Sequence, residues 1–345
     1  MSSSTLHPQF TGLDLCQRDR VRNSESVVPT QLPATRYCGV CRASYPVDFE
    51  ACPRDGARLQ LTGDPLIGEV LNDSYRITSF LGEGGLGRVY RAEHTRMPRT
   101  YAVKFPHGVW VDHPKARARF RNEAIAAGRL DHPNIAAVVD RGELAGGMPY
   151  LVMQFARGES LHEFLRERRG LPVEHALALA RQIALGLEHA HSLDVVHRDL
   201  KPDNVMIEAG RVRIVDFGIS ILTDLGDSGR FTTRGVVIGT PYYMAPEQLL
   251  AGPIDARADL YTLGVMLYEM LAGSRPFLGN AVESAHRTVT GHAPKFAQRA
   301  PWLVVPPAVE DLCQELLARY PSARIASASE VISRIDAIDV RYAQT

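Results

Sequence analysis

Three of the five cysteines in this 345-residue chain lie close together, at Cys38, Cys41 and Cys52, and Asp55 follows at the spacing of a second cysteine pair. A C-x2-C pair followed by a second pair is typical of a zinc site, and thiolate and carboxylate groups are both ordinary zinc ligands. The pattern therefore predicts a zinc site, with Asp55 or else water or another side chain as fourth ligand. A redox-active thiol pair and a site that has lost its metal are the alternatives.

A second group of residues is rich in glycine. Gly82, Gly84, Gly87 and Val89 form the pattern G-x-G-x-x-G-x-V. Such glycines also occur in ordinary hairpins, and a dinucleotide-binding fold needs the run to open a helix. Here the segment GRVYRAEH at 87–94 continues as a strand. Two strands joined by a glycine turn can lie over a nucleotide and offer backbone N–H groups to its phosphates.

Lys104 lies in the next strand-like segment and is one of only four lysines among 39 basic residues. A compact ammonium at the end of a flexible side chain can reach phosphate oxygens from a strand. Glu123, in the helical segment that follows, is the candidate counter-ion for Lys104. Taken alone, Glu123 would be interpreted as a solvated carboxylate on a helix.

The most specific motifs are HRDLKPDN at 197–204 and DFG at 216–218, followed by GTPYYMAPE at 239–247. With the glycine-rich run and Lys104 before them, these motifs occur in one order along residues 70–340. In this respect the chain resembles the eukaryotic-type (bacterial Hanks-type) serine/threonine protein kinases.

The resemblance implies a catalytic set of four residues. Asp199 would accept the proton of the substrate hydroxyl, and Lys201 would contact the γ-phosphate, as in relatives that use Ser/Thr acceptors. Lys104, fixed by Glu123, would hold the α- and β-phosphates. Asn204 and Asp216 would bind Mg²⁺ or Mn²⁺. The implied activity is transfer of the γ-phosphate of ATP to Ser/Thr hydroxyls of protein substrates, with autophosphorylation.

The resemblance also implies an ATP site and two structural pairs. Arg324 would pair with Glu247, and His197 would pack under Phe217 rather than act as a base; Asp259 marks the start of the central helix of the large lobe. The residues expected around ATP are Gly82, Glu83, Gly84, Gly85, Gly87, Val89, Ala102, Lys104, Met153, Gln154, Ala156 and Met206.

A possible switch lies between Asp216 and Glu247. In the family, the arginine before the catalytic aspartate, here Arg198, can pair with a phosphate on this segment, and a phosphoryl group can order a loop by charge-assisted hydrogen bonds. We expect autophosphorylation at Thr232 or Thr233. The alternative is that these are exposed loop threonines without a regulatory role.

The elements that must position these residues fall into two halves. Short strand-like runs between residues 75 and 154 are followed, from about residue 160, by segments with helical periodicity. The expected fold is α+β and bilobal, with a β-rich small lobe, an α-helical large lobe and a cleft between them. The kinase domain is expected at 71–340.

The N-terminal part divides differently. Residues 1–35 are polar and aperiodic, which predicts a disordered leader. Residues 36–60 are too few for a hydrophobic core of their own, resemble a small zinc ribbon, and are expected to fold around structural Zn²⁺. Residues 61–70 are the expected linker. We expect this zinc segment to make regulatory protein contacts.

Composition limits the function classes. Apolar residues at 45% indicate a globular protein, and equal numbers of basic and acidic residues, 39 of each, give no electrostatic argument for nucleic acid or an anionic membrane. The N-terminus lacks the pattern of a secretory signal, and no apolar run is long enough to cross a bilayer. A cytoplasmic location is expected. The alternative function is a kinase-shaped scaffold or nucleotide-binding module with negligible turnover.

Overall fold

The computed structural model describes residues 35–46, 49–60, 63–84, 87–107, 114–145, 147–217 and 241–338. Residues 1–34 of the predicted leader, Gly85 and the loop threonines Thr232 and Thr233 lie outside the described residues, whereas residue 35 already belongs to the first strand. The described residues between 35 and 338 belong to one compact unit. Within the described part of the chain, no helix is long and apolar enough to span a membrane.

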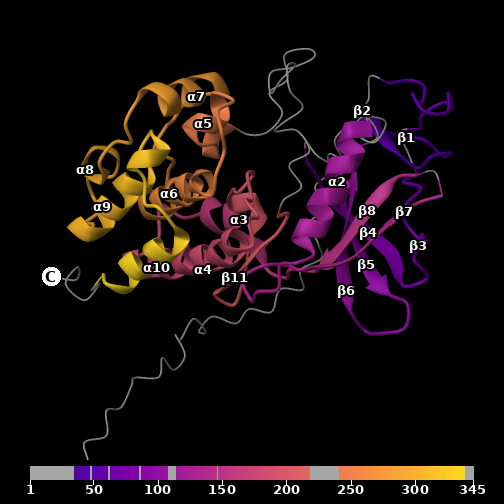
Figure 1. Ribbon diagram of the computed structural model, residues 1–345, viewed down its shortest axis with the longest axis horizontal. Coiled ribbons are helices and arrows are strands. Elements are labelled where there is room, and N and C mark those ends of the chain that lie inside the picture. The colour runs from indigo at the N-terminus through magenta and orange to yellow at the C-terminus, as the bar shows by residue number, and fades with distance from the viewer. Residues whose placement is uncertain are drawn as a thin grey trace, which may run out of the picture. The chain divides into compact units, whose positions relative to one another are not determined.

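The first half is a six-stranded antiparallel sheet in the order β3-β4-β5-β6-β8-β7, shown with helix α2 in Figure 1. The sheet contains the glycine-rich run and Lys104, on neighbouring strands that pair in register. These elements are β3 (Val70–Leu71), β4 (Tyr75–Gly84), β5 (Gly87–His94), β6 (Thr100–Pro106), β7 (Val138–Glu143), β8 (Pro149–Gln154) and α2 (Pro114–Ala127).

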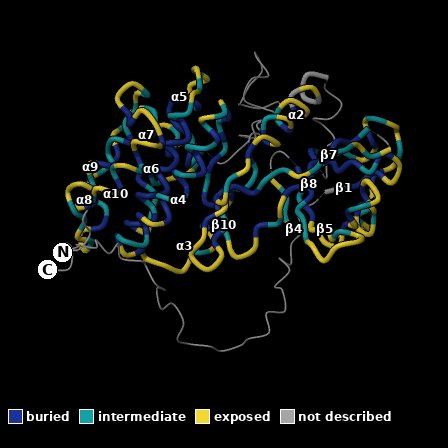
Figure 2. Tube along the Cα trace, turned by 60° about the horizontal axis from the view of Figure 1, so that its bottom comes forward, coloured by how far each residue is buried: buried dark blue, intermediate teal, exposed yellow. Residues whose placement is uncertain are grey.

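The second half is helical and packs around α6 (Arg257–Ala272), which is buried on nearly every side (Figure 2). The predicted apolar face of α4 (Val173–Ser192) is buried against this core. The other helices are α3 (Leu161–Arg166), α5 (Pro246–Leu249), α7 (Ala281–Thr290), α8 (Phe296–Arg299), α9 (Pro307–Leu316) and α10 (Ala328–Asp336), with short 3-10 turns η1 (Pro202–Asn204), η2 (Pro241–Tyr243) and η3 (Pro321–Ala323). The expected strand-rich and helix-rich lobes are confirmed.

A small antiparallel sheet lies next to the catalytic motifs in the sequence. Its order is β11-β10-β9, made of β9 (Glu159–Ser160), β10 (Val205–Glu208) and β11 (Arg211–Ile214). The HRDLKPDN motif ends where β10 begins, and Asp216 follows β11 by two residues. Because β10 and β11 form a hairpin, residues on either side of it return to the same place.

The cysteine segment begins with a hairpin of β1 (Thr35–Tyr37) and β2 (Ser44–Pro46), whose turn carries Cys38 and Cys41. Its apolar side chains do not form an isolated core. They belong to one hydrophobic cluster with the six-stranded sheet, in which Tyr45 and Leu59 of the segment are buried together with Tyr90 and Phe105. A segment too short for its own core therefore shares the core of the neighbouring sheet.

Candidate functional site

Lys104 and Asp216 form a largely buried ion pair, in which the Asp216 side chain is 23% exposed, although 112 positions separate the two residues in the sequence. The Lys104 Nζ lies 2.8 Å from Asp216 Oδ2. Burial raises the pKa of Asp216, but the ammonium of Lys104, together with nearby His197 and Lys201, lowers it by more, so the net shift is downward. Asp216 therefore remains a carboxylate at neutral pH. Its backbone has φ of 63°, a left-handed conformation that is strained for a residue other than glycine.

Asp199, Lys201 and Asn204 lie around one short loop. Lys201 Nζ lies 2.9 Å from Asp199 Oδ2, and Asn204 Nδ2 donates to the backbone oxygen of Asp199 at 2.8 Å. Burial lowers the pKa of Lys201, but the Asp199 carboxylate, together with nearby Asp203 and Asp216, raises it by more, so the net shift is upward. The backbone N–H of Val215 donates to Asn204 O at 2.9 Å, which brings the Asp216 segment alongside this loop.

The backbone of the loop is held by Asp259, a buried residue in the first turn of α6. Its two carboxylate oxygens accept the N–H groups of His197 and Arg198, at 2.8 and 2.9 Å. Arg198 has φ of 65°, so this left-handed residue is strained and needs such support. Gln248 adds a second restraint, since its Nε2 donates to Arg198 O at 2.7 Å.

These restraints are not predicted from the sequence. There Asp259 is only a marker of the central helix, and Gln248 has no predicted role. The available signal is a charged residue beside the apolar segment LYTLGVML that follows Asp259. A buried carboxylate needs hydrogen-bond donors, and unpaired backbone N–H groups are natural ones.

His197 and Phe217 pack together as the resemblance implied, with ring centroids 4.6 Å apart. His197 is fully buried, and its Nε2 lies 3.0 Å from Val215 O. The imidazole is therefore part of the packing beneath the loop, and the implied packing is confirmed.

Glu247 and Arg324 form a second buried ion pair, also confirming the implied partnership. The two Nη atoms of Arg324 lie 2.6 and 2.7 Å from the two oxygens of Glu247. Arg324 Nε also donates to Ala318 O, and its Nη atoms donate to the carbonyls of Arg257 and Arg319. This planar, fully used set of donors joins α5 to the segment before α10.

The described residues expected around ATP lie on the strands β4, β5, β6, β8 and β10, except Ala156, which follows β8. Gly82 pairs with Val89 and Gly84 with Gly87 across the β4–β5 hairpin, and Ala102 pairs with Met153 across β6 and β8. A Cβ at position 87 would overlap the backbone oxygen of Phe105, so only glycine fits there.

The expected ATP residues differ in exposure. Val89, Ala102 and Met206 are each partly exposed. Met153 and Ala156 are buried, and Gln154 is exposed. Glu123 lies half-buried on α2, and its pairing with Lys104 stays a prediction.

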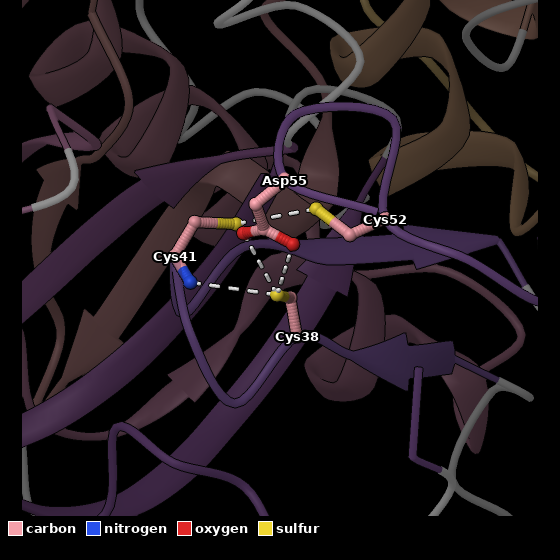
Figure 3. Close-up of side chains that lie close together, drawn as sticks. All are labelled: Cys38, Cys41, Cys52 and Asp55. Carbon is pink, nitrogen blue, oxygen red and sulfur yellow. Dashed lines mark hydrogen bonds between the residues drawn. The ribbon is translucent and has the colours of Figure 1, made fainter. Parts of the chain in front are cut away.

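Cys38, Cys41, Cys52 and Asp55 come together at the hairpin turn and the loop after Ala51, as Figure 3 shows. One ligand atom from each lies within 4.8 Å of all the others. The sulfurs of Cys41 and Cys52 are 3.5 Å apart, and Asp55 Oδ2 lies 3.2 Å from the Cys38 sulfur. A disulfide would bring two sulfurs to about 2.05 Å. Burial raises the pKa of Cys38, and that of Cys41 to about 12.

Comparison with protein families gives one match over most of the chain. The model described as "Protein kinase domain" matches residues 75–334. This range contains every residue of the candidate site except the cysteine cluster.

The chain is similar to several curated bacterial proteins. It is 36% identical to serine/threonine-protein kinase pkn3 of Myxococcus xanthus, over 80% of this chain and 52% of that protein. It is 36% identical to PknB of Mycobacterium leprae, over 79% of this chain and 44% of that protein. With PknL of Mycobacterium tuberculosis it shares 35% identity, over 80% of this chain and 68% of that protein. The chain thus spans about half the length of the curated relatives it matches.

Solved structures give the same result. The crystal structure of the kinase domain of Mycobacterium tuberculosis PknI superposes with a TM-score of 0.61 at 28% identity. The alignment covers 78% of this chain and 96% of that chain.

Proposed function

The chain belongs to the protein kinase domain family, as a bacterial Hanks-type serine/threonine kinase domain, and from that premise we propose that it transfers the γ-phosphate of ATP to Ser and Thr hydroxyls of protein substrates. The observation that carries the proposal is the pairing of Lys104 with Asp216, at 2.8 Å, beside the pair of Asp199 and Lys201, at 2.9 Å. Two cations and two carboxylates in one place are suited to a transfer that depends on positioning and charge neutralisation. We place this reaction in the cytoplasm.

Asp199 is the residue we assign to the acceptor. Its Oδ2 is held by Lys201, and its side chain is 35% exposed, so an incoming hydroxyl can approach it. In this assignment Asp199 orients the hydroxyl and accepts its proton, while Lys201 neutralises charge on the transferring phosphoryl group. Lys104, supported by Glu123, binds the α- and β-phosphates.

Asn204 and Asp216 suit a divalent cation, Mg²⁺ or Mn²⁺. Asp216 remains ionised because of Lys104, and carboxylate and amide oxygens are hard ligands for such ions. The amide nitrogen of Asn204 donates a hydrogen bond to Asp199 O, and this bond fixes the orientation of the amide group. When bound, the cation would neutralise phosphate charge and orient the phosphates for transfer.

Labelled ATP tests the proposed activity directly. Purified protein is incubated with labelled ATP and Mg²⁺, and transfer to itself and to a generic protein acceptor is compared between wild type and Asp199→Asn. We expect label on serine and threonine with the wild type and a loss of at least about 10²-fold with Asp199→Asn. No labelling by the wild type would favour the scaffold alternative, and equal labelling by both proteins would contradict the role assigned to Asp199.

We also infer that Cys38, Cys41, Cys52 and Asp55 bind one structural Zn²⁺. Tetrahedral zinc with bonds of about 2.3 Å to sulfur separates two thiolate sulfurs by about 3.8 Å. The 3.5 Å between the Cys41 and Cys52 sulfurs is near that value and far from a disulfide. Three buried thiols with one exposed carboxylate also match a closed structural site.

Elemental analysis tests the metal. Freshly purified protein, never exposed to chelator, should contain one zinc per chain, and Cys38→Ser/Cys41→Ser should contain none. Cys16→Ser, a cysteine outside the cluster, is the matched control and should keep the metal. A wild-type protein without zinc would contradict the assignment, and thiols that oxidise reversibly to a Cys41–Cys52 disulfide would favour the redox alternative.

A further inference from the structure

Arg88 is a buried cation in the second strand of the glycine-rich hairpin, where it pairs across the hairpin with Glu83. It is 3% exposed. Its Nη1 lies 2.7 Å from Asp64 Oδ2, and its Nε lies 3.6 Å from Glu83 Oε2. The guanidinium also lies over the ring of Tyr37, 4.7 Å from its centroid. Two carboxylates and an aromatic face compensate the burial of this charge.

Arg88 does not face the nucleotide side of the strand. Successive side chains of a strand point to opposite faces, so Arg88 and its neighbour Val89 point to opposite faces of the sheet. Val89 is one of the residues expected around ATP. Arg88 can therefore affect ATP only through the shape of the hairpin.

His107, just after β6, makes a second connection between the cysteine segment and the glycine-rich hairpin. Its Nε2 lies 2.9 Å from Gly84 O and 3.5 Å from Glu83 Oε1, and its Nδ1 lies 3.3 Å from Ser44 Oγ. One neutral tautomer satisfies both hydrogen bonds, because Nε2–H donates to Gly84 O and Nδ1 accepts from the Ser44 hydroxyl. Burial lowers the pKa of His107, which favours this neutral form.

Tyr37, Ser44 and Asp64 all lie outside the segment matched by the kinase family, in the cysteine segment and the residues just after it. Tyr37 and Asp64 contact Arg88, and Ser44 contacts His107. Arg88 lies on β5 and pairs with Glu83 of β4, and His107 contacts Gly84 at the end of β4. Glycine gives a chain wide conformational freedom, so a hairpin built from it needs external restraint to keep one shape for the phosphates.

We propose that the cysteine segment positions the glycine-rich hairpin for ATP, with Arg88 and His107 as the positioning residues that transmit the contact. This inference rests on the proposed function, because it assigns the hairpin to the ATP phosphates. It gives the N-terminal segment an indirect part in nucleotide binding, through the shape of the hairpin, in addition to metal binding.

The experiment measures equilibrium affinity for ATP, by fluorescence titration with Mg²⁺ in an Asp199→Asn background, so that binding is read without turnover. His107→Leu removes both hydrogen bonds, and His107→Gln keeps one donor and one acceptor. Ser44→Ala removes one of the two bonds with little change in volume. His292→Leu, at an exposed position in the helical half, is the matched control. Melting temperatures are recorded for all variants.

We expect His107→Leu to weaken ATP binding by about two- to tenfold, the range of one or two lost hydrogen bonds. His107→Gln should restore it, and Ser44→Ala should weaken binding alone but add nothing to His107→Leu. In the active protein the same variants should raise KM for ATP more than they lower kcat. Unchanged affinity in both His107→Leu and Ser44→Ala, or equal weakening by His107→Gln, would overturn the proposal. Absence of turnover in wild type, with these binding differences intact, would instead count against the proposed function alone.

Discussion

Asp259 accepts the backbone N–H of Arg198 at 2.9 Å, and Arg198 directly precedes the candidate catalytic Asp199. The other carboxylate oxygen of Asp259 accepts from His197 and also lies 2.9 Å from His191 Nε2. One buried side chain on α6 therefore fixes the strained start of the catalytic loop. Its contribution can be measured separately from the chemistry.

We expect Asp259→Asn to lower both the melting temperature and kcat. An amide has one acceptor oxygen, so one of the N–H groups of His197 and Arg198 loses its partner, at a cost of roughly 1–3 kcal/mol. Asp311→Asn, at an exposed position of α9, should leave both values unchanged. Differential scanning calorimetry and initial rates give the comparison.

The difference in stability between wild type and Asp259→Asn is expected to depend on pH. Burial would raise the pKa of Asp259, but the hydrogen bond from His191 and nearby positive charge lower it. A lowered pKa in the folded state stabilises the protein above the unfolded value of about 3.9, and this stabilisation is lost as pH falls below that value. The stability difference between wild type and Asp259→Asn should therefore be full at pH 6 and shrink in acid. A difference that grows in acid would contradict the charged assignment.

Lys104→Met and Asp216→Asn should each lower phosphoryl transfer by about 10² to 10³ or more, because each removes one charge from the ATP and metal site. Both should keep a cooperative melting transition. Lys295→Met, an exposed lysine at the start of α8, is the control. Transfer within about tenfold of wild type in Asp216→Ala, which removes the side-chain oxygens as well as the charge, would contradict the assignment of Asp216 as a metal ligand.

Arg324→Met should be strongly destabilising. It leaves the Glu247 carboxylate buried without its partner, and breaking a buried pair in this way costs roughly 3–5 kcal/mol. Arg334→Met provides the matched control, since Arg334 pairs with Glu315 at 2.7 Å but both side chains are more than a third exposed. That exposed pair should contribute at most about 1 kcal/mol. Similar losses in the two variants, measured by urea unfolding, would show that burial of the pair has no such effect.

Autophosphorylation at Thr232 or Thr233 remains a prediction for a segment outside the described residues. A phosphate there would pair with Arg198 and raise activity, since it adds about −1.5 to −2 charges and strong acceptor oxygens. Mass-spectrometric peptide mapping after incubation with ATP should find the phosphate, and Thr232→Ala/Thr233→Ala should be less active. An equally active double variant would refute the switch and leave the kinase assignment intact.

The family and the two lobes could be predicted from the sequence alone, because the residues that identify the family occur in short local motifs. HRDLKPDN and DFG place an acid, an amide and a second acid at spacings that one hairpin brings together. The strand-like and helical periodicities likewise depend on neighbouring residues. The four zinc candidates could also be predicted, because C-x2-C spacing places both sulfurs on one turn.

Only the tertiary structure decided which distant residues support this site. The sequence around Asp259 does not predict that its side chain accepts the N–H groups of His197 and Arg198. Likewise, the sequence around Arg88 does not predict its contacts with Tyr37 and Asp64. The cysteine segment, too short for a core, joins that of the six-stranded sheet. Such contacts depend on how whole elements pack, because burying a charge or a strained loop is tolerable only where distant groups supply its partners.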